Sequence, residues 1–130
     1  MNSLKNIRIK IISFGFKYGL PSEAHFMQDV RFLPNPYYVL ELKSKPGTCI
    51  DVSSYVLSPD VTKDYLKRLC NLLDFYIPEY LKSGKEELII AIGCTGGRHR
   101  SVAVACELYS YISSLGYNTE IFHRDISKEN

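Results

Sequence analysis

The sequence lacks several features that would place a protein in a functional class at once. No apolar run approaches the roughly 18 residues of a membrane-spanning helix. Residues 1–6 have no cleavable signal, and we expect a cytoplasmic protein that is not bound to a membrane. The net charge of +2 is too small to predict nucleic-acid binding by itself.

Disulfide and metal chemistry are also not predicted. The four cysteines (Cys49, Cys70, Cys94 and Cys106) form no CxxC pair and no cysteine–histidine cluster with metal-ligand spacing. A disulfide framework is not expected in a cytosolic chain of this size. We therefore predict no structural disulfide, no metal site and no cofactor.

The hydrophobic pattern predicts a single α/β domain over residues 1–130. The predicted strands are residues 7–14, 25–33, 88–92 and 118–124, the predicted helices are residues 61–82 and 102–115, and residues 37–59 are predicted to be irregular. Pro78 should kink or end the first helix. Strands that alternate with long helices imply a mainly parallel sheet with flanking helices. Ligands of such sheets bind beyond the carboxyl ends of the strands.

A glycine-rich turn, residues 93–101 (GCTGGRHRS), joins a predicted buried strand to a predicted helix. Its amide groups and the positive end of the helix dipole would bind an anion. The positive charges of the Arg98, His99 and Arg100 segment lie near the positive end of that dipole, which is electrostatically unfavourable. A bound anion would offset this repulsion. Thr95 would contact the ligand or only cap the helix, and His99 would contact it or be a buried structural histidine. The turn therefore predicts a phosphate or carboxylate site.

This turn is not a nucleotide-binding P-loop. A Walker P-loop has four residues between its glycines, followed by Lys-Ser or Lys-Thr. Here three residues separate Gly93 from Gly97, and Arg98 follows. ATP hydrolysis by this chain is therefore not predicted.

A phosphatase is an alternative interpretation of the same turn. Cys94 and Arg100 have the Cys-x5-Arg spacing of cysteine-dependent phosphatases, in which a thiolate attacks phosphorus and the arginine clamps the phosphate. Asp29 or Asp125 would then be the general acid. The interior of the turn, Thr-Gly-Gly-Arg-His, differs from the usual loops of those enzymes. The sequence therefore favours a site that binds an anion without catalysis over a phosphatase.

The strand predicted at residues 25–33 carries two opposite charges on one side. Asp29 and Arg31 are two residues apart, which places both side chains on the same face of a strand. They would form an ion pair within the chain or face a ligand, and both readings stay open. Pro34 and Pro36 end the strand, because proline has no amide donor and restricts the residue before it.

Four segments together resemble the C-terminal domain of the RapZ (YvcJ-like) family. They are residues 13–19 (SFGFKYG), 29–36 (DVRFLPNP), 91–103 (AIGCTGGRHRSVA) and 123–125 (HRD), in the family's order and over nearly the whole chain. The resemblance implies a fold like the sugar-phosphate-binding subdomain of phosphofructokinase. RapZ-like proteins usually carry an N-terminal P-loop nucleotide-binding domain, which this sequence lacks. The chain thus resembles a stand-alone or excised C-terminal domain, and a separate nucleotide-binding protein is a partner that the resemblance implies.

The resemblance also implies a regulatory domain rather than an enzyme. In enterobacterial members this domain senses a phosphorylated amino sugar, glucosamine-6-phosphate. Carried over to this chain, the phosphate-binding residues are Thr95, Gly96, Gly97, His99, Arg100 and Ser101. The residues that would face the sugar are Asp29, Arg31, Asn35 and Tyr37. A carboxylate such as Asp29 suits the ammonium group of an amino sugar.

RNA binding is a second function that the resemblance implies. Enterobacterial members bind small RNAs and present them to an endoribonuclease, and known members self-associate, so we expect a homo-oligomer. Members that bind RNA end in a basic cluster after the His-Arg pair, whereas this chain ends in residues 125–130 (DISKEN). The few cations in this tail would neutralise few RNA phosphates. The sequence therefore favours sugar-phosphate binding over RNA binding.

Overall fold

A four-stranded parallel sheet forms the centre of the computed structural model, which describes residues 7–128. Its strands are β1 (Arg8–Gly15), β2 (Phe26–Asp29), β3 (Glu87–Cys94) and β4 (Asn118–His123). They are ordered β2-β3-β1-β4, and each neighbouring pair is parallel. The predicted α/β class with a parallel sheet is confirmed. The segment predicted to lack a signal, residues 1–6, and the last two residues of the C-terminal tail lie outside the described residues.

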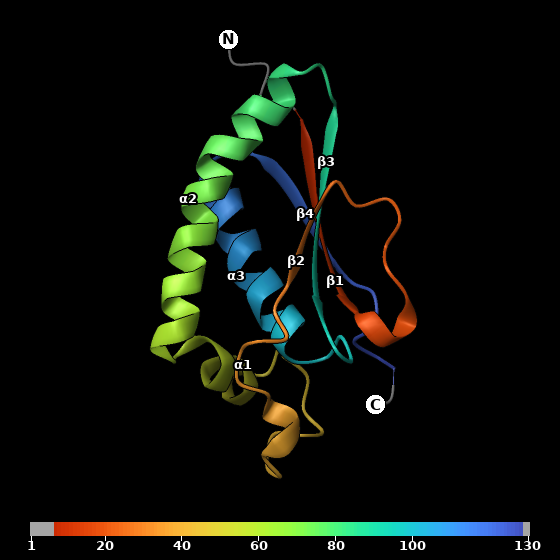
Figure 1. The fold of residues 1–130 in the computed structure, drawn as a ribbon, viewed down its shortest axis with the longest axis vertical. Helices are drawn as coiled ribbons and strands as arrows, with labels where there is room; N and C mark the ends of the chain where they lie inside the picture. The colour runs from red at the N-terminus through yellow and green to blue at the C-terminus, as the bar shows by residue number, and fades with distance from the viewer. Residues whose placement is uncertain (1–6, 129–130) are drawn as a thin grey trace.

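The long helices lie on one face of the sheet, and a loop crosses the other face (Figure 1). The helices are α1 (Ile50–Leu57), α2 (Asp60–Lys82) and α3 (Arg100–Ser114), with 3-10 turns at Phe16–Tyr18 and Pro36–Tyr38. Alternate residues of the central strands, such as Ile11 and Ile90, pack in one core with Leu73 of α2 and Leu108 of α3. Each fully buried side chain of this kind stabilises the fold by about 1.5–3 kcal/mol. No helix in residues 7–128 has both the length and the hydropathy to span a membrane.

Three elements differ from the sequence prediction. The stretch predicted to be irregular contains α1, whose single buried stripe consists of Val52 and Val56, too short to show a helical period. Pro78 does not end α2, because burial of Ile77 and Leu81 on either side of it holds the helix together to Lys82.

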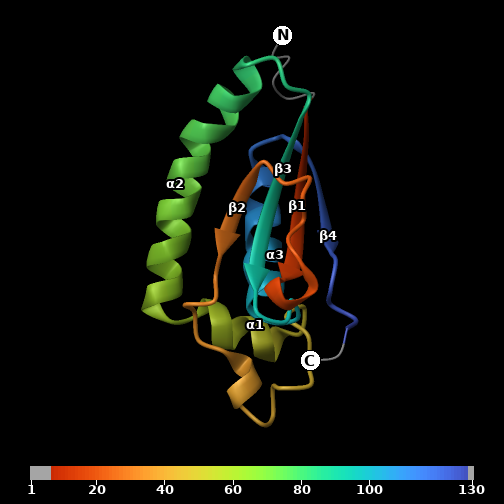
Figure 2. The ribbon, with the colours of Figure 1, turned by 45° about the vertical axis from the view of Figure 1, so that its right-hand side comes forward.

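The second predicted strand is shorter than expected. β2 ends at Asp29, and the amide of Leu33 donates to the carbonyl of Val30, which closes a turn. Arg31 therefore lies in a turn and not on the strand face that Asp29 occupies. The carboxyl ends of β1, β2 and β3 meet at one edge of the sheet, and the turns that follow them gather there (Figure 2).

Candidate functional site

Segments distant in sequence hold the glycine-rich turn between β3 and α3. The Lys17 amide donates to the Thr95 carbonyl at 3.2 Å, and the Gly47 amide donates to the Arg98 carbonyl at 2.7 Å. The Arg98 side chain donates from Nε to the Ile126 carbonyl at 3.0 Å. The turn is therefore fixed before any ligand binds.

Glycine is required where the turn packs against the end of β1. Gly97 has φ = +79°, and a Cβ built on it would lie 2.5 Å from the Gly15 nitrogen. A Cβ on Gly15 would lie 2.5 Å from the Gly96 carbonyl carbon. Backbone atoms cannot move aside as a flexible side chain can. The glycines at positions 15 and 97 thus serve close packing of backbone on backbone, and Gly97 also has a positive φ that other residues rarely adopt.

A cavity of about 260 Å³ opens beside the turn. Its lining combines both predicted sets, namely Thr95, Gly96, His99 and Arg100 from the phosphate set and Asn35 and Tyr37 from the sugar set, together with Lys17, Tyr38, Cys94 and Arg98. The volume is just under the roughly 300 Å³ at which small-molecule sites begin, which suits a small ligand. The cavity carries the basic side chains of Lys17, Arg98 and Arg100, and none of the residues that line it is an aspartate or glutamate.

Arg100 is a buried cation held mainly by carbonyl groups. Its side chain is 5% exposed, and Nη1 donates to the Arg31 carbonyl at 2.5 Å and to the Leu33 carbonyl at 3.3 Å. Nη2 donates to the Thr95 hydroxyl at 3.4 Å, while Nε is buried and has no partner within residues 7–128. No ion pair within residues 7–128 joins Arg100 to a carboxylate, and the charge of Asp29 acts on it without direct contact. A buried cation without a directly paired carboxylate is costly, and an anion in the cavity would lower that cost.

His99 adds a second unpartnered polar atom. It is the N-cap residue of α3 but makes no capping hydrogen bond with its side chain. Burial, together with the adjacent Arg98, lowers the pKa of His99, while hydrogen bonding to the backbone of Lys43 and Lys45 acts in the opposite direction. The imidazole is therefore neutral near pH 7. Its Nε2 atom is buried and meets no partner among the described residues.

Two predicted phosphate ligands point away from the cavity. Ser101 is fully buried, and its Oγ accepts a hydrogen bond from the Cys94 thiol at 3.1 Å. Gly97 is buried against Gly15 and Asp125. The structure thus gives Ser101 and Gly97 supporting positions behind the turn, whereas Thr95, Gly96, His99 and Arg100 face the cavity.

Two predicted sugar ligands form an ion pair at the surface. Arg31 Nη2 lies 2.6 Å from Asp29 Oδ2, and the Arg31 guanidinium lies over the Phe16 ring at 4.1 Å. The hydrogen bond from the Arg31 side chain lowers the pKa of Asp29. Neither residue lines the cavity. Of the two readings that the sequence leaves open, this structure shows the ion pair.

Lys17, Tyr38 and Arg98 line the cavity but are not among the predicted ligands. Lys17 follows the carboxyl end of β1. This position could have indicated Lys17 as a lining residue, because ligands of parallel sheets bind at that edge. Tyr38 adjoins the predicted Tyr37, and Arg98 belongs to the predicted turn. Each could have been found by applying the sheet-edge rule to every turn at this edge.

The geometry offers little for phosphatase chemistry. Cys94 is 2% exposed and donates its thiol hydrogen bond to Ser101. Asp29, one candidate acid, is bound to Arg31 at the surface. Burial alone would raise the pKa of Asp125, the other candidate, but hydrogen bonds from Arg124, Lys128 and Gly15 hold it below its usual value. Neither carboxylate lines the cavity. No cluster of three or more potential metal ligands occurs in residues 7–128.

Comparison with known proteins identifies the family. Residues 7–127 match the family described as the RapZ C-terminal domain. The chain is 55% identical over 127 residues to a nucleotide-binding protein of Caldicellulosiruptor saccharolyticus. The aligned region covers 98% of this chain and 43% of that protein. It is 57% identical over 121 residues to a nucleotide-binding protein of Caldicellulosiruptor bescii, and this alignment covers 93% of this chain and 42% of that protein. It is 54% identical over 121 residues to a nucleotide-binding protein of Clostridium botulinum strain Hall, with 93% of this chain and 41% of that protein covered.

The chain therefore spans about two-fifths of the length of these relatives. The name "nucleotide-binding protein" describes those longer proteins. The match extends from the start of β1 to the segment beyond β4, so it includes every strand and helix described above. The resemblance seen in the sequence is confirmed, and the chain belongs to the RapZ C-terminal domain family.

Proposed function

We propose that this chain is a regulatory, non-catalytic domain that binds a sugar phosphate, with glucosamine-6-phosphate as its ligand. The observation that carries the proposal is the cavity at the carboxyl edge of the sheet. There Arg100 Nε and His99 Nε2 are buried and have no hydrogen-bond partner among residues 7–128, beside a preformed glycine turn and the start of α3. Membership of the RapZ C-terminal domain family supports the same reading.

The phosphate group would bind at the turn. The Gly96 amide and the amides of the first turn of α3 are donors, and a dianion at a helix N-terminus interacts favourably with the helix dipole. Arg100 and Arg98 supply positive charge next to these amides. A phosphate dianion would accept a hydrogen bond from Arg100 Nε and, once the imidazole has taken up a proton, from His99 Nε2, and it would offset the basic lining.

The sugar would lie against the opposite wall. Asn35 and Tyr37 are fixed relative to each other, because the Asn35 side chain accepts a hydrogen bond from the Tyr37 amide at 3.1 Å. Tyr37 and Tyr38 present ring surface together with hydroxyl groups, a combination suited to a polar ligand with apolar faces. Binding of the amino group would require Asp29 to turn from Arg31 toward the cavity. This part of the proposal rests on the family resemblance, and the phosphate part rests on the cavity.

Calorimetric titration with a series of related ligands tests the proposal. Glucosamine-6-phosphate should bind most tightly. Glucose-6-phosphate lacks the amino group and should bind at least about tenfold less tightly, because one charged hydrogen bond contributes about 1.5–3 kcal/mol. Glucosamine without phosphate should show no binding. The variant Arg68→Ala, which removes an exposed cation of α2 that does not line the cavity, should leave every affinity unchanged.

Two outcomes would contradict this proposal. One is the absence of binding by any hexose phosphate at millimolar concentration. The other is binding of glucosamine as tight as that of its phosphate ester. RNA binding with a steep dependence on salt, in the absence of sugar-phosphate binding, would support the RNA interpretation in its place.

A further inference from the structure

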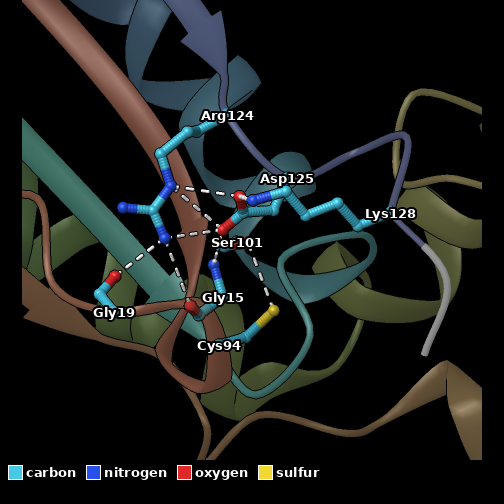
Figure 3. A network of polar contacts seen from close by, with 7 residues as sticks. All are labelled: Gly15, Gly19, Cys94, Ser101, Arg124, Asp125 and Lys128. Atoms are coloured by element: carbon cyan, nitrogen blue, oxygen red, sulfur yellow. Dashed lines mark hydrogen bonds and ion pairs between the residues drawn. The ribbon is translucent and has the colours of Figure 1, made fainter.

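The last described segment of the chain, residues 124–128, lies directly behind the glycine-rich turn. We call these residues the C-terminal strap. Beyond the end of β4, the Arg124 amide donates to the Ser13 carbonyl at 3.0 Å, and the Lys128 amide donates to the Asp125 carbonyl at 3.1 Å. These bonds place the strap beside the carboxyl end of β1 (Figure 3).

Asp125 is the fixed point of the strap. Its side chain is fully buried and accepts a hydrogen bond from the Gly15 amide at 2.7 Å. It also forms ion pairs with Arg124 Nη2 and Lys128 Nζ, each at 2.8 Å (Figure 3). Arg124 Nη2 also donates a hydrogen bond to the Gly19 carbonyl at 2.7 Å. Asp125 and Arg124 together thus tie the strap to both ends of the loop of residues 15–19, through Gly15 and Gly19 respectively.

The strap reaches the anion site at two points. The first is the contact of Asp125 with Gly97, where a Cβ on Gly97 would lie 2.9 Å from the Asp125 Cβ. The second is the Ile126 carbonyl, which accepts the hydrogen bond from Arg98 Nε at 3.0 Å. Arg98 lines the cavity, so this bond sets the direction of one of its cationic side chains.

A buried carboxylate behind an anion site would by itself repel the ligand. The ion pairs with Arg124 and Lys128 offset that charge, so the repulsion is removed while the hydrogen bond to Gly15 is kept. The same bonds hold the pKa of Asp125 below its usual value in spite of burial, which would raise it. The carboxylate therefore stays ionised over the neutral pH range and continues to accept the Gly15 hydrogen bond.

We propose that the C-terminal strap is a positioning element of the anion site. Asp125 sets the position of the glycine turn through Gly15 and Gly97, and the Ile126 carbonyl aims the Arg98 guanidinium. Ligand binding and docking of the strap then stabilise each other, because coupling between two sites is reciprocal. Ligand binding at the turn would therefore stabilise the docked conformation of residues 124–128. This inference rests on the proposed function.

Titration and hydrogen exchange on the full chain test the inference together. Asp125→Ala removes the Gly15 bond and both ion pairs, and it should weaken binding of glucosamine-6-phosphate about fivefold or more. Asp125→Asn keeps an oxygen acceptor for Gly15 and should recover part of that loss. The control is Asp74→Ala, which breaks a surface hydrogen bond between α2 and Tyr111 and should leave the affinity unchanged. In the wild-type chain, the ligand should slow hydrogen exchange at the Arg124 and Lys128 amides.

The readouts separate this inference from the proposed function. If the wild-type chain binds no hexose phosphate, the proposed function fails. If the wild-type chain binds the ligand, the positioning role is overturned by unchanged affinity in a folded Asp125→Ala variant, or by unaltered exchange at the strap amides. If Asp125→Ala does not fold, the exchange measurement on the wild-type chain decides the question alone, since it needs no substitution.

Discussion

Replacement of Arg100 by methionine is expected to reduce binding of glucosamine-6-phosphate at least 100-fold. Arg100 is the most deeply buried of the basic side chains that line the cavity, and its Nε atom has no partner in the described chain. Loss of two charged hydrogen bonds to phosphate costs about 3–6 kcal/mol. Methionine keeps much of the length of the stem but removes the donors and the charge. Calorimetric titration measures the loss directly.

Two further variants separate the charge of Arg100 from its geometry. Arg100→Lys keeps the positive charge but not the planar fork, so an intermediate loss of about tenfold is expected. Arg68→Met is the matched control on the surface of α2 and should bind as the wild-type chain does. Arg100 also holds the Arg31 and Leu33 carbonyls, so the melting temperature of each variant must be measured as well. Affinity of a folded Arg100→Met variant within about threefold of wild type would remove Arg100 from the site.

Ligand binding is expected to take up a proton at His99 near pH 7.5. The lowered pKa keeps His99 neutral in the free chain. A phosphate dianion beside Nε2 would favour the imidazolium form and raise the pKa, so a proton is taken up between the free and bound pKa values. The affinity gained in this way is lost as the pH rises above the bound pKa. At about pH 7.5 the phosphate is itself a dianion, since its second pKa is about 6, and contributes little to the proton count.

Titrations in two buffers with different ionisation enthalpies measure this uptake. The charged groups around His99 are Arg98 and Arg100, and Lys17 also lines the cavity. His99→Gln keeps a polar side chain that does not titrate, so it should bind more weakly and show no buffer dependence. Equal proton uptake by the wild-type and His99→Gln chains would assign the proton to another group.

The strand pattern and the glycine turn were predictable because both are local in sequence. Residues 88–92 are a continuous apolar run, as expected of a central parallel strand buried on both faces. The GCTGGRHRS segment carries its anion-binding chemistry in consecutive residues. In contrast, α1 buries only Val52 and Val56 of its eight residues, so no periodicity distinguishes it from a loop.

The direction of individual side chains was less predictable than their location. Arg100 and Ser101 are neighbours at the start of α3, but successive helical residues point about 100° apart, so one reaches the cavity and the other enters the core. Asp29 and Arg31 would share a face only if β2 continued, and it ends at Asp29. Asp125 acts on the turn through the Gly15 amide 110 residues away, a contact that no local pattern in the sequence indicates.

A crystal structure of the chain with glucosamine-6-phosphate bound would test the proposed site most directly. The phosphate is expected within hydrogen-bond distance of the Gly96 amide, the Arg100 guanidinium and His99 Nε2, with the sugar between Asn35 and the tyrosines at positions 37 and 38. Ligand density elsewhere, for example in the groove between α2 and α3 that includes Lys63 and Lys67, with none at the glycine turn, would contradict the proposal.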